Sequence, residues 1–459
     1  MSAHPLPDRV AGEVAVIGLG KSGAAAASLL RARGYRVYVS DAGSSQSVQD
    51  RASPLERQGV SVDVGSHDLE RIARATLVVV SPGIEPDAAP VAAARDAGIE
   101  IISEIELALR AAPALKYIAV TGTNGKTTTT ALIGHLLRAL GADAPDAGNI
   151  GTPLCEIVAR PHLPAWVALE LSSFQLHDTP SVAPVVGVLT NLAPDHLDRY
   201  ATVDEYYADK ARMFANASST SRWVVNADDR ASLDLARGIA GKTLYFSVVD
   251  EADAFYDRQH DVLQLLGDAL LPRAELPLLG DHNVANALAA ALAVAAAAPE
   301  HRSTAAIDAM AHGLASFHAL KHRLEIVGEW NGVQWINDSK ATNVASTLVA
   351  INGMTRPTVL LLGGRHKGEP YTALVDGIRD HATHVIAYGE AGPIVMQDLD
   401  GKVPVEHVTG SFDDVMARAA ELANPGDSVL LSPACSSYDM FNNYMERGER
   451  FRALASATA

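Results

Sequence analysis

The chain has 459 residues, long enough for about three domains, and 48% of them are hydrophobic, enough for several cores. Its formal net charge of −17 argues against binding to nucleic acid or to an anionic membrane surface. Two cysteines cannot build a disulfide framework and fit a reducing cytoplasm. The first ten residues lack the pattern of a secretory signal, and the alanine-rich stretch at 287–298 is too short to span a membrane.

The first predicted unit, between residues 13 and 41, is strand, glycine turn, helix and strand. The turn carries Gly18, Gly20 and Gly23 in the G-x-G-x-x-G spacing with Lys21 between them, and the second strand ends at Asp41. This order is typical of Rossmann-like nucleotide-binding folds, where glycines let phosphate approach the backbone and the acid accepts hydrogen bonds from a ribose or base. The pattern alone leaves NAD and other nucleotides open.

A third strand is predicted at 75–80 and runs into Ser81-Pro82-Gly83. A glycine turn at the carboxyl end of a parallel strand adds to a phosphate-binding crevice, although a plain structural turn explains it equally well. A connecting helix is expected at 103–110, followed by a break.

The second predicted domain opens with a buried strand at 117–120, a glycine turn and a helix at 127–140. The turn and helix start read Gly122-Thr123-Asn124-Gly125-Lys126-Thr127-Thr128. Such a turn cradles a triphosphate: backbone N–H groups and the helix N-terminus face the phosphates, lysine neutralises charge and the threonine hydroxyl can bind Mg²⁺. The usual first glycine is replaced by Val120, so we expect a shortened phosphate loop rather than an ordinary turn.

Two further strands of this domain end in polar residues. One ends at Glu170, and the other is followed by Asn191 and then by Asp195-His196. Because ligands bind at strand carboxyl ends in open α/β sheets, Glu170 and His196 are expected to point toward the phosphate loop and ligate a divalent metal. A capping or core role is the alternative for His196.

Later parts of the domain give weaker signals. Lys210 lies on a predicted helix and, taken alone, is expected to be solvated. The stretch 244–277 contains short β-like runs. Asn283 and Asn286 lie in the first turn of the alanine-rich helix, where their amides could contact adenine or phosphate, with capping as the alternative.

A histidine- and cation-rich linker at 317–323 precedes a third predicted domain, again Rossmann-like. Three of its strands end in charged or polar turns, at 337–343, 363–367 and 432–439. A reaction of ATP with two anionic substrates would use three α/β domains with ligand-binding edges and a phosphate loop. This organisation favours an ATP-driven ligase that activates a carboxylate as an acyl phosphate.

Six motifs in order resemble the Mur ligase family over nearly the whole chain. They are Thr121 to Thr128, Gly148-Asn149-Ile150-Gly151, Glu170 to Gln175, Asp195 to Tyr200, Asn337 to Asn343 and Leu431 to Cys435. The resemblance implies three α/β domains, an N-terminal Rossmann-like UDP-binding domain at 1–108, a central phosphate-loop ATPase-like domain with a parallel sheet at 109–318, and a C-terminal Rossmann-like domain at 319–459. It also implies ATP and Mg²⁺, a cytoplasmic monomer, and the joining of D-glutamate to UDP-N-acetylmuramoyl-L-alanine for peptidoglycan synthesis.

The resemblance assigns roles residue by residue. The UDP-substrate contacts are Gly18, Gly20, Lys21, Asp41, Ser81, Pro82, Gly83, Asn149 and His196. ATP would be bound by Gly122, Thr123, Asn124, Gly125, Lys126, Thr127, Thr128, Asn283, Asn286, Arg323 and Asp338. The metal ligands would be Thr127, Glu170, His196 and Lys210, the last as a carbamylated lysine, because an ammonium repels Mg²⁺ while a carbamate supplies anionic oxygens. Lys126, Lys210, His196 and Glu170 are the expected catalytic residues, and Lys340, Thr342, Lys367, Ser437 and Tyr444 would hold glutamate.

Two departures bear on the amino acid. Lys321 stands where the family usually has proline before the histidine, and Tyr444 replaces a common phenylalanine. The added hydroxyl leaves L-glutamate as an alternative. A folylpolyglutamate-synthase-like ligase is a second alternative, and an NAD-dependent oxidoreductase, suggested by the first glycine turn, belongs to a different class.

Overall fold

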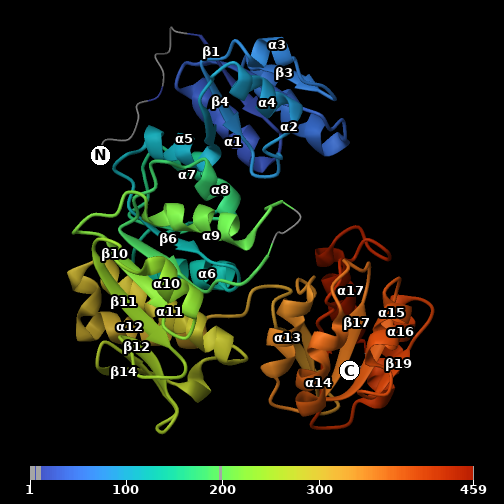
Figure 1. Ribbon diagram of the computed structural model, residues 1–459. Coiled ribbons are helices and arrows are strands. Elements are labelled where there is room, and N and C mark those ends of the chain that lie inside the picture. The colour runs from blue at the N-terminus through green and yellow to red at the C-terminus, as the bar shows by residue number, and fades with distance from the viewer. Residues whose placement is uncertain (1–5, 7–11, 196–198, 458–459) are drawn as a thin grey trace. The chain divides into compact units, whose positions relative to one another are not determined.

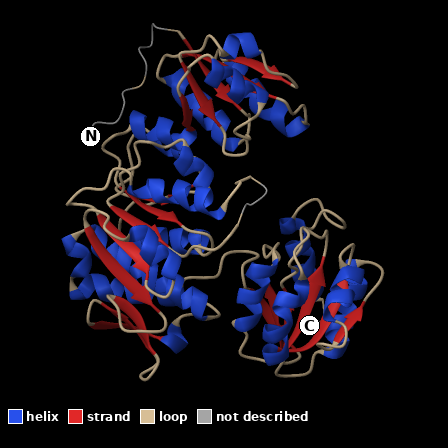
Figure 2. Cartoon of the chain, viewed as in Figure 1, coloured by secondary structure: helices blue, strands red, loops and turns tan. Residues whose placement is uncertain are grey.

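The computed structural model describes residue 6 and residues 12–195 and 199–457, and its strands and helices alternate along the chain (Figures 1 and 2). They form three sheets, so the predicted α/β class is confirmed. The chain divides into two compact units, residues 1–273 with 286–314, and residues 274–285 with 315–459. The first unit contains two of the sheets and the second contains the third. None of the helices within these described ranges has the length and apolarity needed to cross a membrane.

The N-terminal sheet has five parallel strands in the order β3-β2-β1-β4-β5. The strand order reverses between β1 and β4, and a crevice for ligands forms at such a point. The two predicted glycine turns follow these two strands. The predicted helix begins at Lys21, directly after Gly20, whose extended backbone occupies the N-cap position. The elements are β1 (Glu13–Ile17), α1 (Lys21–Ala32), β2 (Arg36–Asp41), α2 (Gln46–Arg57), β3 (Ser61–Val64), α3 (Leu69–Ile72), β4 (Leu77–Val80), α4 (Ala89–Asp96), β5 (Ile101–Ser103) and α5 (Glu104–Ala111).

The central sheet has nine strands in the order β14-β13-β12-β11-β10-β9-β6-β8-β7. The strands from β7 to β12 pair in parallel, and β13 and β14 add an antiparallel edge where the sequence predicts short β runs. Its strands are β6 (Tyr117–Thr121), β7 (Asp146–Gly148), β8 (Val167–Glu170), β9 (Val186–Leu189), β10 (Arg222–Asn226), β11 (Lys242–Ser247), β12 (Ala254–Asp257), β13 (Val262–Leu265) and β14 (Asp268–Pro272). Its helices are α6 (Lys126–Ala139), α7 (Leu154–Val158), α8 (Ser173–His177), α9 (Val203–Ala211), η1 (Arg212–Phe214), α10 (Arg230–Ala236), η2 (Arg273–Glu275), α11 (Asp281–Ala297), η3 (Pro299–Arg302) and α12 (Thr304–Ser316).

The third sheet, in the second unit, has the order β15-β16-β20-β17-β18-β19. Only the edge strand β15 pairs antiparallel, so the predicted strand ends at 337–343, 363–367 and 432–439 all lie at the same edge of the sheet. The elements are β15 (Glu325–Trp330), β16 (Val333–Asn337), α13 (Val344–Asn352), β17 (Thr358–Gly363), η4 (Tyr371–Leu374), α14 (Val375–His381), β18 (Ala382–Tyr388), α15 (Gly392–Leu399), β19 (Val405–His407), α16 (Phe412–Leu422), β20 (Ser428–Leu431) and α17 (Tyr444–Ser456).

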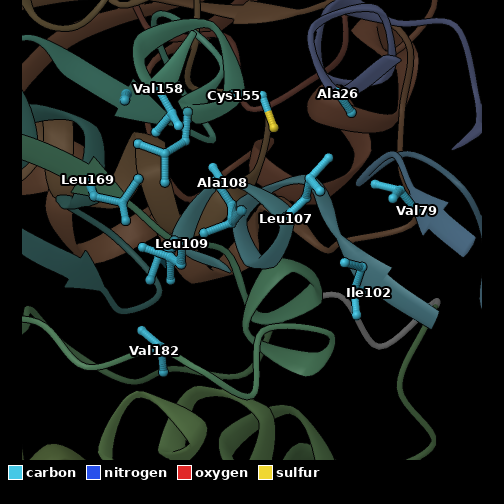
Figure 3. Close-up of a cluster of buried hydrophobic side chains, with 14 of the residues drawn as sticks. Ala26, Val79, Ile102, Leu107, Ala108, Leu109, Cys155, Val158, Leu169 and Val182 are labelled. Carbon is cyan, nitrogen blue, oxygen red and sulfur yellow. The ribbon is translucent and has the colours of Figure 1, made fainter. Parts of the chain in front are cut away.

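One buried cluster joins the first two sheets. It runs from α1 and β4 through α5 and α7 to the central strand β8 (Figure 3). Leu107, Ala108 and Cys155 in its middle are fully buried. Burial at about 25 cal/mol per Å² makes such a shared core the main force holding the two sheets together.

A buried ion pair reinforces this junction. On α5, the guanidinium of Arg110 donates to the Glu106 carboxylate at 2.6 Å, and both side chains are excluded from solvent. Arg110 also pairs with Glu100, just before β5, at 2.7 Å. The hydroxyl and backbone N–H of Ser181, from the segment leading to β9, donate to Glu106 at 2.6 and 2.9 Å. Helix α5 therefore fastens the N-terminal sheet to the central one.

Breaking this pair should destabilise the first unit. Glu106→Ala leaves the Arg110 charge buried with a reduced set of partners, and we expect a loss of about 3 to 5 kcal/mol of unfolding free energy in urea titrations. The matched control is Glu70→Ala, because Glu70 forms an exposed pair with Arg74 on a short helix. Its expected cost is below about 1 kcal/mol, and equal losses in the two variants would contradict the structural role of Glu106.

Candidate active site

The loop between β6 and α6 depends on two glycines. Gly125 caps α6 at a φ of +79°, and a Cβ there would lie 2.3 Å from Oδ1 of Asn286. Gly122 has a φ of +141°, and its Cβ would lie 2.0 Å from the hydroxyl oxygen of Thr190. Neither position accepts a side chain without displacing a neighbour, so the backbone stays open above the helix N-terminus, where phosphate binds.

Asn191, at the end of the neighbouring strand β9, holds this loop in place. Its Oδ1 accepts from the backbone N–H of Asn124 at 2.9 Å, and its Nδ2 donates to the Asn124 carbonyl at 3.0 Å. The Thr190 hydroxyl donates to the same carbonyl at 2.6 Å. No role was predicted for Asn191 from the sequence. Its position after the carboxyl end of a strand nevertheless indicated that it could contact the loop.

Two lysines converge on one backbone oxygen of the loop. Nζ of Lys126 donates to the carbonyls of Gly122 and Thr123 at 3.0 and 2.7 Å. Nζ of Lys210, at the end of α9, donates to the same Gly122 carbonyl at 2.7 Å. Lys210 is only 1% exposed, so the expectation of a solvated lysine, based on that residue alone, is wrong. Burial, and secondarily the charge of Lys126, holds the pKa of Lys210 well below its ordinary value.

Helix α9 also contributes contacts around Lys210. Its Nζ lies 4.4 Å from the centre of the Tyr206 ring, and the Tyr206 hydroxyl is 3.3 Å from the Thr123 hydroxyl. Asp209 accepts from His177, Arg212 and Tyr200. Tyr206 precedes Lys210 by four residues, so the helical i, i+4 spacing was the signal for this contact.

Glu170 ends β8 with one carboxylate oxygen engaged and one not. Oε1 accepts from Nδ2 of Asn149 at 2.7 Å, a contact between two of the motifs that the sequence did not predict. Oε2 is buried and has no hydrogen-bond donor within the described part of the chain. A buried carboxylate oxygen without a donor fits a hard cation such as Mg²⁺.

The rest of the predicted metal set is only partly visible. His196 lies outside the described residues. Within the residues that are described, no three His, Cys, Asp or Glu side chains gather to hold a metal ion.

The two asparagines at the start of α11 differ in their surroundings. Oδ1 of Asn286 accepts from the Thr129 hydroxyl at 3.1 Å, which brings it to the phosphate loop. Nδ2 of Asn283 donates to the Leu279 carbonyl at 2.8 Å, so this side chain connects the helix to the segment that precedes it.

The glycine turn after β1 is braced by Asp41 and Ser81. The carboxylate of Asp41 accepts from the backbone N–H groups of Leu19 and Gly43 at 2.6 and 2.7 Å, and the Ser81 hydroxyl donates to the Gly18 carbonyl at 3.1 Å. Asp41 thus shapes the turn, a role beyond the predicted contact to a ribose or base. A cavity of about 320 Å³ is lined by Ser81 and Pro82 of the turn after β4 and extends to helix α8, with Ile84, Phe174, Gln175 and Arg199 among its other lining residues.

In the second unit, the residues predicted to hold an amino acid cluster at the sheet edge. Nζ of Lys367 donates to the Thr342 hydroxyl at 3.4 Å, and Nζ of Lys340 lies 5.3 Å from the centre of the Tyr444 ring. Ser437 is buried after β20. The structure thus pairs Lys367 with Thr342, after β17 and β16, and Lys340 with Tyr444, the first residue of α17, while Ser437 lies in the loop after β20.

Asp338 and Arg323 belong to the same unit. Oδ2 of Asp338 accepts from the Ser432 hydroxyl at 2.8 Å and Oδ1 from the backbone N–H of Leu324 at 3.2 Å. Burial raises the pKa of Asp338 to about 7, while the hydrogen bonds and the charge of Arg323 act in the opposite direction.

Three models of protein-family domains match successive parts of the chain. The Mur ligase MurD-like N-terminal domain matches residues 12–103, the Mur ligase middle domain 120–294, and the Mur ligase glutamate ligase domain 322–435. The chain is 39% identical to the UDP-N-acetylmuramoylalanine–D-glutamate ligase of Acidobacterium capsulatum, covering 97% of this chain and 96% of that one. It is 36% identical to the enzyme of the same name from Koribacter versatilis, with 97% of both chains covered.

Solved structures agree on the fold. The UDP-N-acetylmuramate–alanine ligase of Thermotoga maritima superposes with a TM-score of 0.61 at 18% identity, over 98% of this chain and all of that one. A pseudomurein peptide ligase from Methanothermus fervidus gives the same TM-score at 19% identity, with 98% and 100% covered.

The glycine at the start of α6 offers a test of the phosphate loop. Gly125→Ala forces the loop to shift or Asn286 to give up its bond to Thr129, so we expect ATP affinity to fall at least about tenfold in fluorescent-nucleotide titrations. Gly141→Ala is the matched control, because Gly141 has a φ of +82° and no atom within 4 Å of an added Cβ. Both variants should lose about 1 to 2 kcal/mol of stability through backbone strain. Unchanged ATP affinity in Gly125→Ala would exclude this loop as the phosphate site.

Proposed function

The chain belongs to the Mur ligase family, and we propose on that basis that it joins D-glutamate to UDP-N-acetylmuramoyl-L-alanine at the expense of ATP, in the synthesis of a peptidoglycan precursor. The observation that carries this function is the end-to-end identity of 36 to 39% with enzymes named for that reaction. The order of the three matched domains and the six sequence motifs support it.

The reaction we propose has two steps. A carboxylate oxygen of the UDP-linked substrate attacks the γ-phosphorus of ATP, and ADP leaves, which yields an acyl phosphate. The amine of glutamate then attacks the acyl carbon, phosphate leaves with the bonding electron pair, and the amine loses a proton. Most of the catalysis comes from positioning and from neutralising phosphate charge. In this chain Lys126 and the backbone N–H groups of residues 122–128 do that work.

Mg²⁺ would be held by Thr127, Glu170 and Lys210, with His196 as a further predicted ligand. The free Oε2 of Glu170 supports this assignment. When bound, the ion supplies charge neutralisation at the phosphates. Asn149 orients the Glu170 carboxylate through its bond to Oε1.

Carbamylation of Lys210 is part of the proposal. A lysine attacks CO₂ only as the neutral amine, and burial beside Lys126 favours that form. The carbamate would replace a second buried ammonium by an anion and would add oxygen ligands for the metal. The charge balance around the Gly122 carbonyl therefore favours the modified side chain.

The UDP-linked substrate is assigned to the first unit. We place its diphosphate near Gly18 to Lys21 and Ser81 to Gly83, and its uracil near Asp41. The cavity lined by Ser81, Phe174 and Gln175 supports this placement, because it connects the turn after β4 with the motif that begins at Glu170. The assignments of Arg323, Asp338 and Asn283 to ATP, and of Lys340, Thr342, Lys367, Ser437 and Tyr444 to glutamate, are likewise proposals.

The alternatives are weaker on the same grounds. A folylpolyglutamate-synthase-like ligase does not explain the match to a MurD-like N-terminal domain. An NAD-dependent oxidoreductase does not explain the phosphate loop that carries Lys126. L-Glutamate is the remaining alternative, because of the Tyr444 hydroxyl. We further propose a cytoplasmic monomer with small-molecule substrates and with neither a nucleic-acid nor a membrane partner.

Phosphate release tests the function directly. The protein is incubated with ATP, Mg²⁺, UDP-N-acetylmuramoyl-L-alanine and either enantiomer of glutamate, and we expect release with D-glutamate only. Reactions that lack the UDP-linked substrate are the control. Release with L-glutamate alone would keep the ligase and reverse the stereochemistry, while no release with either enantiomer would overturn the proposal.

The role of Lys210 has its own test. Lys210→Ala should lower kcat to about one-hundredth or less, because the variant lacks one ligand of the metal ion that would neutralise the phosphate charge. A short carboxylic acid such as acetate should restore part of the activity by supplying the missing anion. The control is Lys242→Ala, an exposed lysine at the start of β11. Full activity of Lys210→Ala without acetate would refute the metal-binding role.

A further inference from the structure

A hydrogen-bonded chain of three side chains joins two of the loops assigned to glutamate. The Tyr371 hydroxyl lies 2.8 Å from Sγ of Cys435 and 3.0 Å from Nδ1 of His366. Tyr371 and Cys435 are 1% and 0% exposed. None of these three residues has a role in the function proposed above. Their neighbours do, because Lys367 directly follows His366 and Ser437 comes two residues after Cys435.

The two loops leave adjacent parallel strands. β17 and β20 pair in register up to Leu361 and Leu431, so the loops start side by side. Backbone bonds join them at two levels, where the N–H of Gly363 donates to the Pro433 carbonyl at 3.1 Å and the N–H of Arg365 donates to the Ser436 carbonyl at 2.8 Å. The Tyr371 chain adds a side-chain attachment from His366, beyond these two backbone bonds, to Cys435.

Cys435 also connects to the third loop of the site. Its carbonyl accepts from Nη2 of Arg447 at 3.1 Å, and the same guanidinium donates to the Ser339 hydroxyl and carbonyl at 2.9 and 2.8 Å. Arg447 is fully buried. Ser339 directly precedes Lys340, so Cys435 is a junction between all three loops.

The turn that carries Cys435 is itself under tension. Ala434 has a φ of +55°, a left-handed conformation that is unfavourable for a residue with a Cβ. Such a conformation persists only where surrounding contacts over-determine it. The bonds from Tyr371 and Arg447 to Cys435 are among the contacts that hold this turn, together with the bond from the Gly363 N–H to the Pro433 carbonyl.

The direction of the hydrogen bonds is limited by protonation. Burial raises the pKa of the Cys435 thiol to about 11 and also raises the pKa of Tyr371, so both groups keep their protons at neutral pH. The Tyr371 hydroxyl can then donate to Nδ1 of His366 and accept from the Cys435 thiol. The two buried polar atoms, the Tyr371 hydroxyl oxygen and Sγ of Cys435, are both hydrogen-bonded in this arrangement.

We propose that Tyr371, with His366 and Cys435, is a positioning element that sets the spacing of Lys367 and Ser437 and thereby the affinity for the incoming amino acid. The inference rests on the proposed function, which assigns those two residues to glutamate. Tyr371 does not touch the substrate, and it acts through the two loops that it joins.

The test separates glutamate binding from the rest of catalysis. Tyr371→Phe removes one hydroxyl and keeps the ring, and we expect KM for D-glutamate to rise about tenfold. KM for ATP and for the UDP-linked substrate should stay within about twofold, since those residues are not bonded to Tyr371. Tyr117→Phe is the matched control, because its buried hydroxyl accepts from the Ala183 N–H at the far end of β6 and should change none of the three constants.

A second pair of variants identifies the hydrogen bond as the cause. His366→Asn keeps a polar group near the position of Nδ1 and should change KM for D-glutamate less than about threefold, whereas His366→Ala should match Tyr371→Phe. An unchanged KM in Tyr371→Phe, an equal rise in all three constants, or equal effects of the two His366 variants would each overturn the inference. Wild-type protein that releases no phosphate with glutamate would instead overturn the proposed function.

Discussion

The Gly122 carbonyl is the point on which the site depends, because two lysine side chains donate to it from different elements. Two ammonium groups bound to the same carbonyl repel each other, and burial makes their charges more costly unless an anion lies nearby. For Lys126 that anion would be the phosphate, because its side chain lies in the loop that we assign to phosphate. Lys210 is enclosed, and burial lowers its pKa although the carboxylates of Asp195 and Glu170 act in the opposite direction. One backbone oxygen thus binds two lysines that lie in different surroundings.

The two lysines meet at the Gly122 carbonyl only if α9 stays beside the phosphate loop, and nearby side chains hold the helix there. Tyr206 contacts both Thr123 and Lys210, and Asp209 accepts from three donors: His177 of α8, Arg212 of η1 and Tyr200 in the loop before α9. The shared core and the Arg110–Glu106 pair tie the N-terminal sheet into the same unit. The turn that we assign to UDP and the loop that we assign to ATP are therefore parts of one packed body, and packed interiors deform little.

The sequence predicted the α/β class, the glycine turns and the strand ends, because these follow from local spacing. It did not predict that Asn149 would bond to Glu170. It did not predict the burial of Lys210 from the residue itself. Position along a helix says which residues share a face, as for Tyr206, but not which face is covered by a strand far away in sequence. Asn191 and the Tyr371–Cys435 contact were missed for the same reason: both depend on which strands become neighbours.

The missing first glycine of the phosphate loop has a structural explanation. Val120 lies inside β6, which pairs in parallel with β8 on one side and β9 on the other, and its side chain is fully buried. The strand continues through Thr121, so the backbone leaves the sheet only at Gly122. A glycine at 120 would weaken a central strand and gain nothing, because no phosphate can reach a residue that is covered on both faces. The shortened loop follows from a longer strand, and the two remaining glycines are the ones whose backbone must turn.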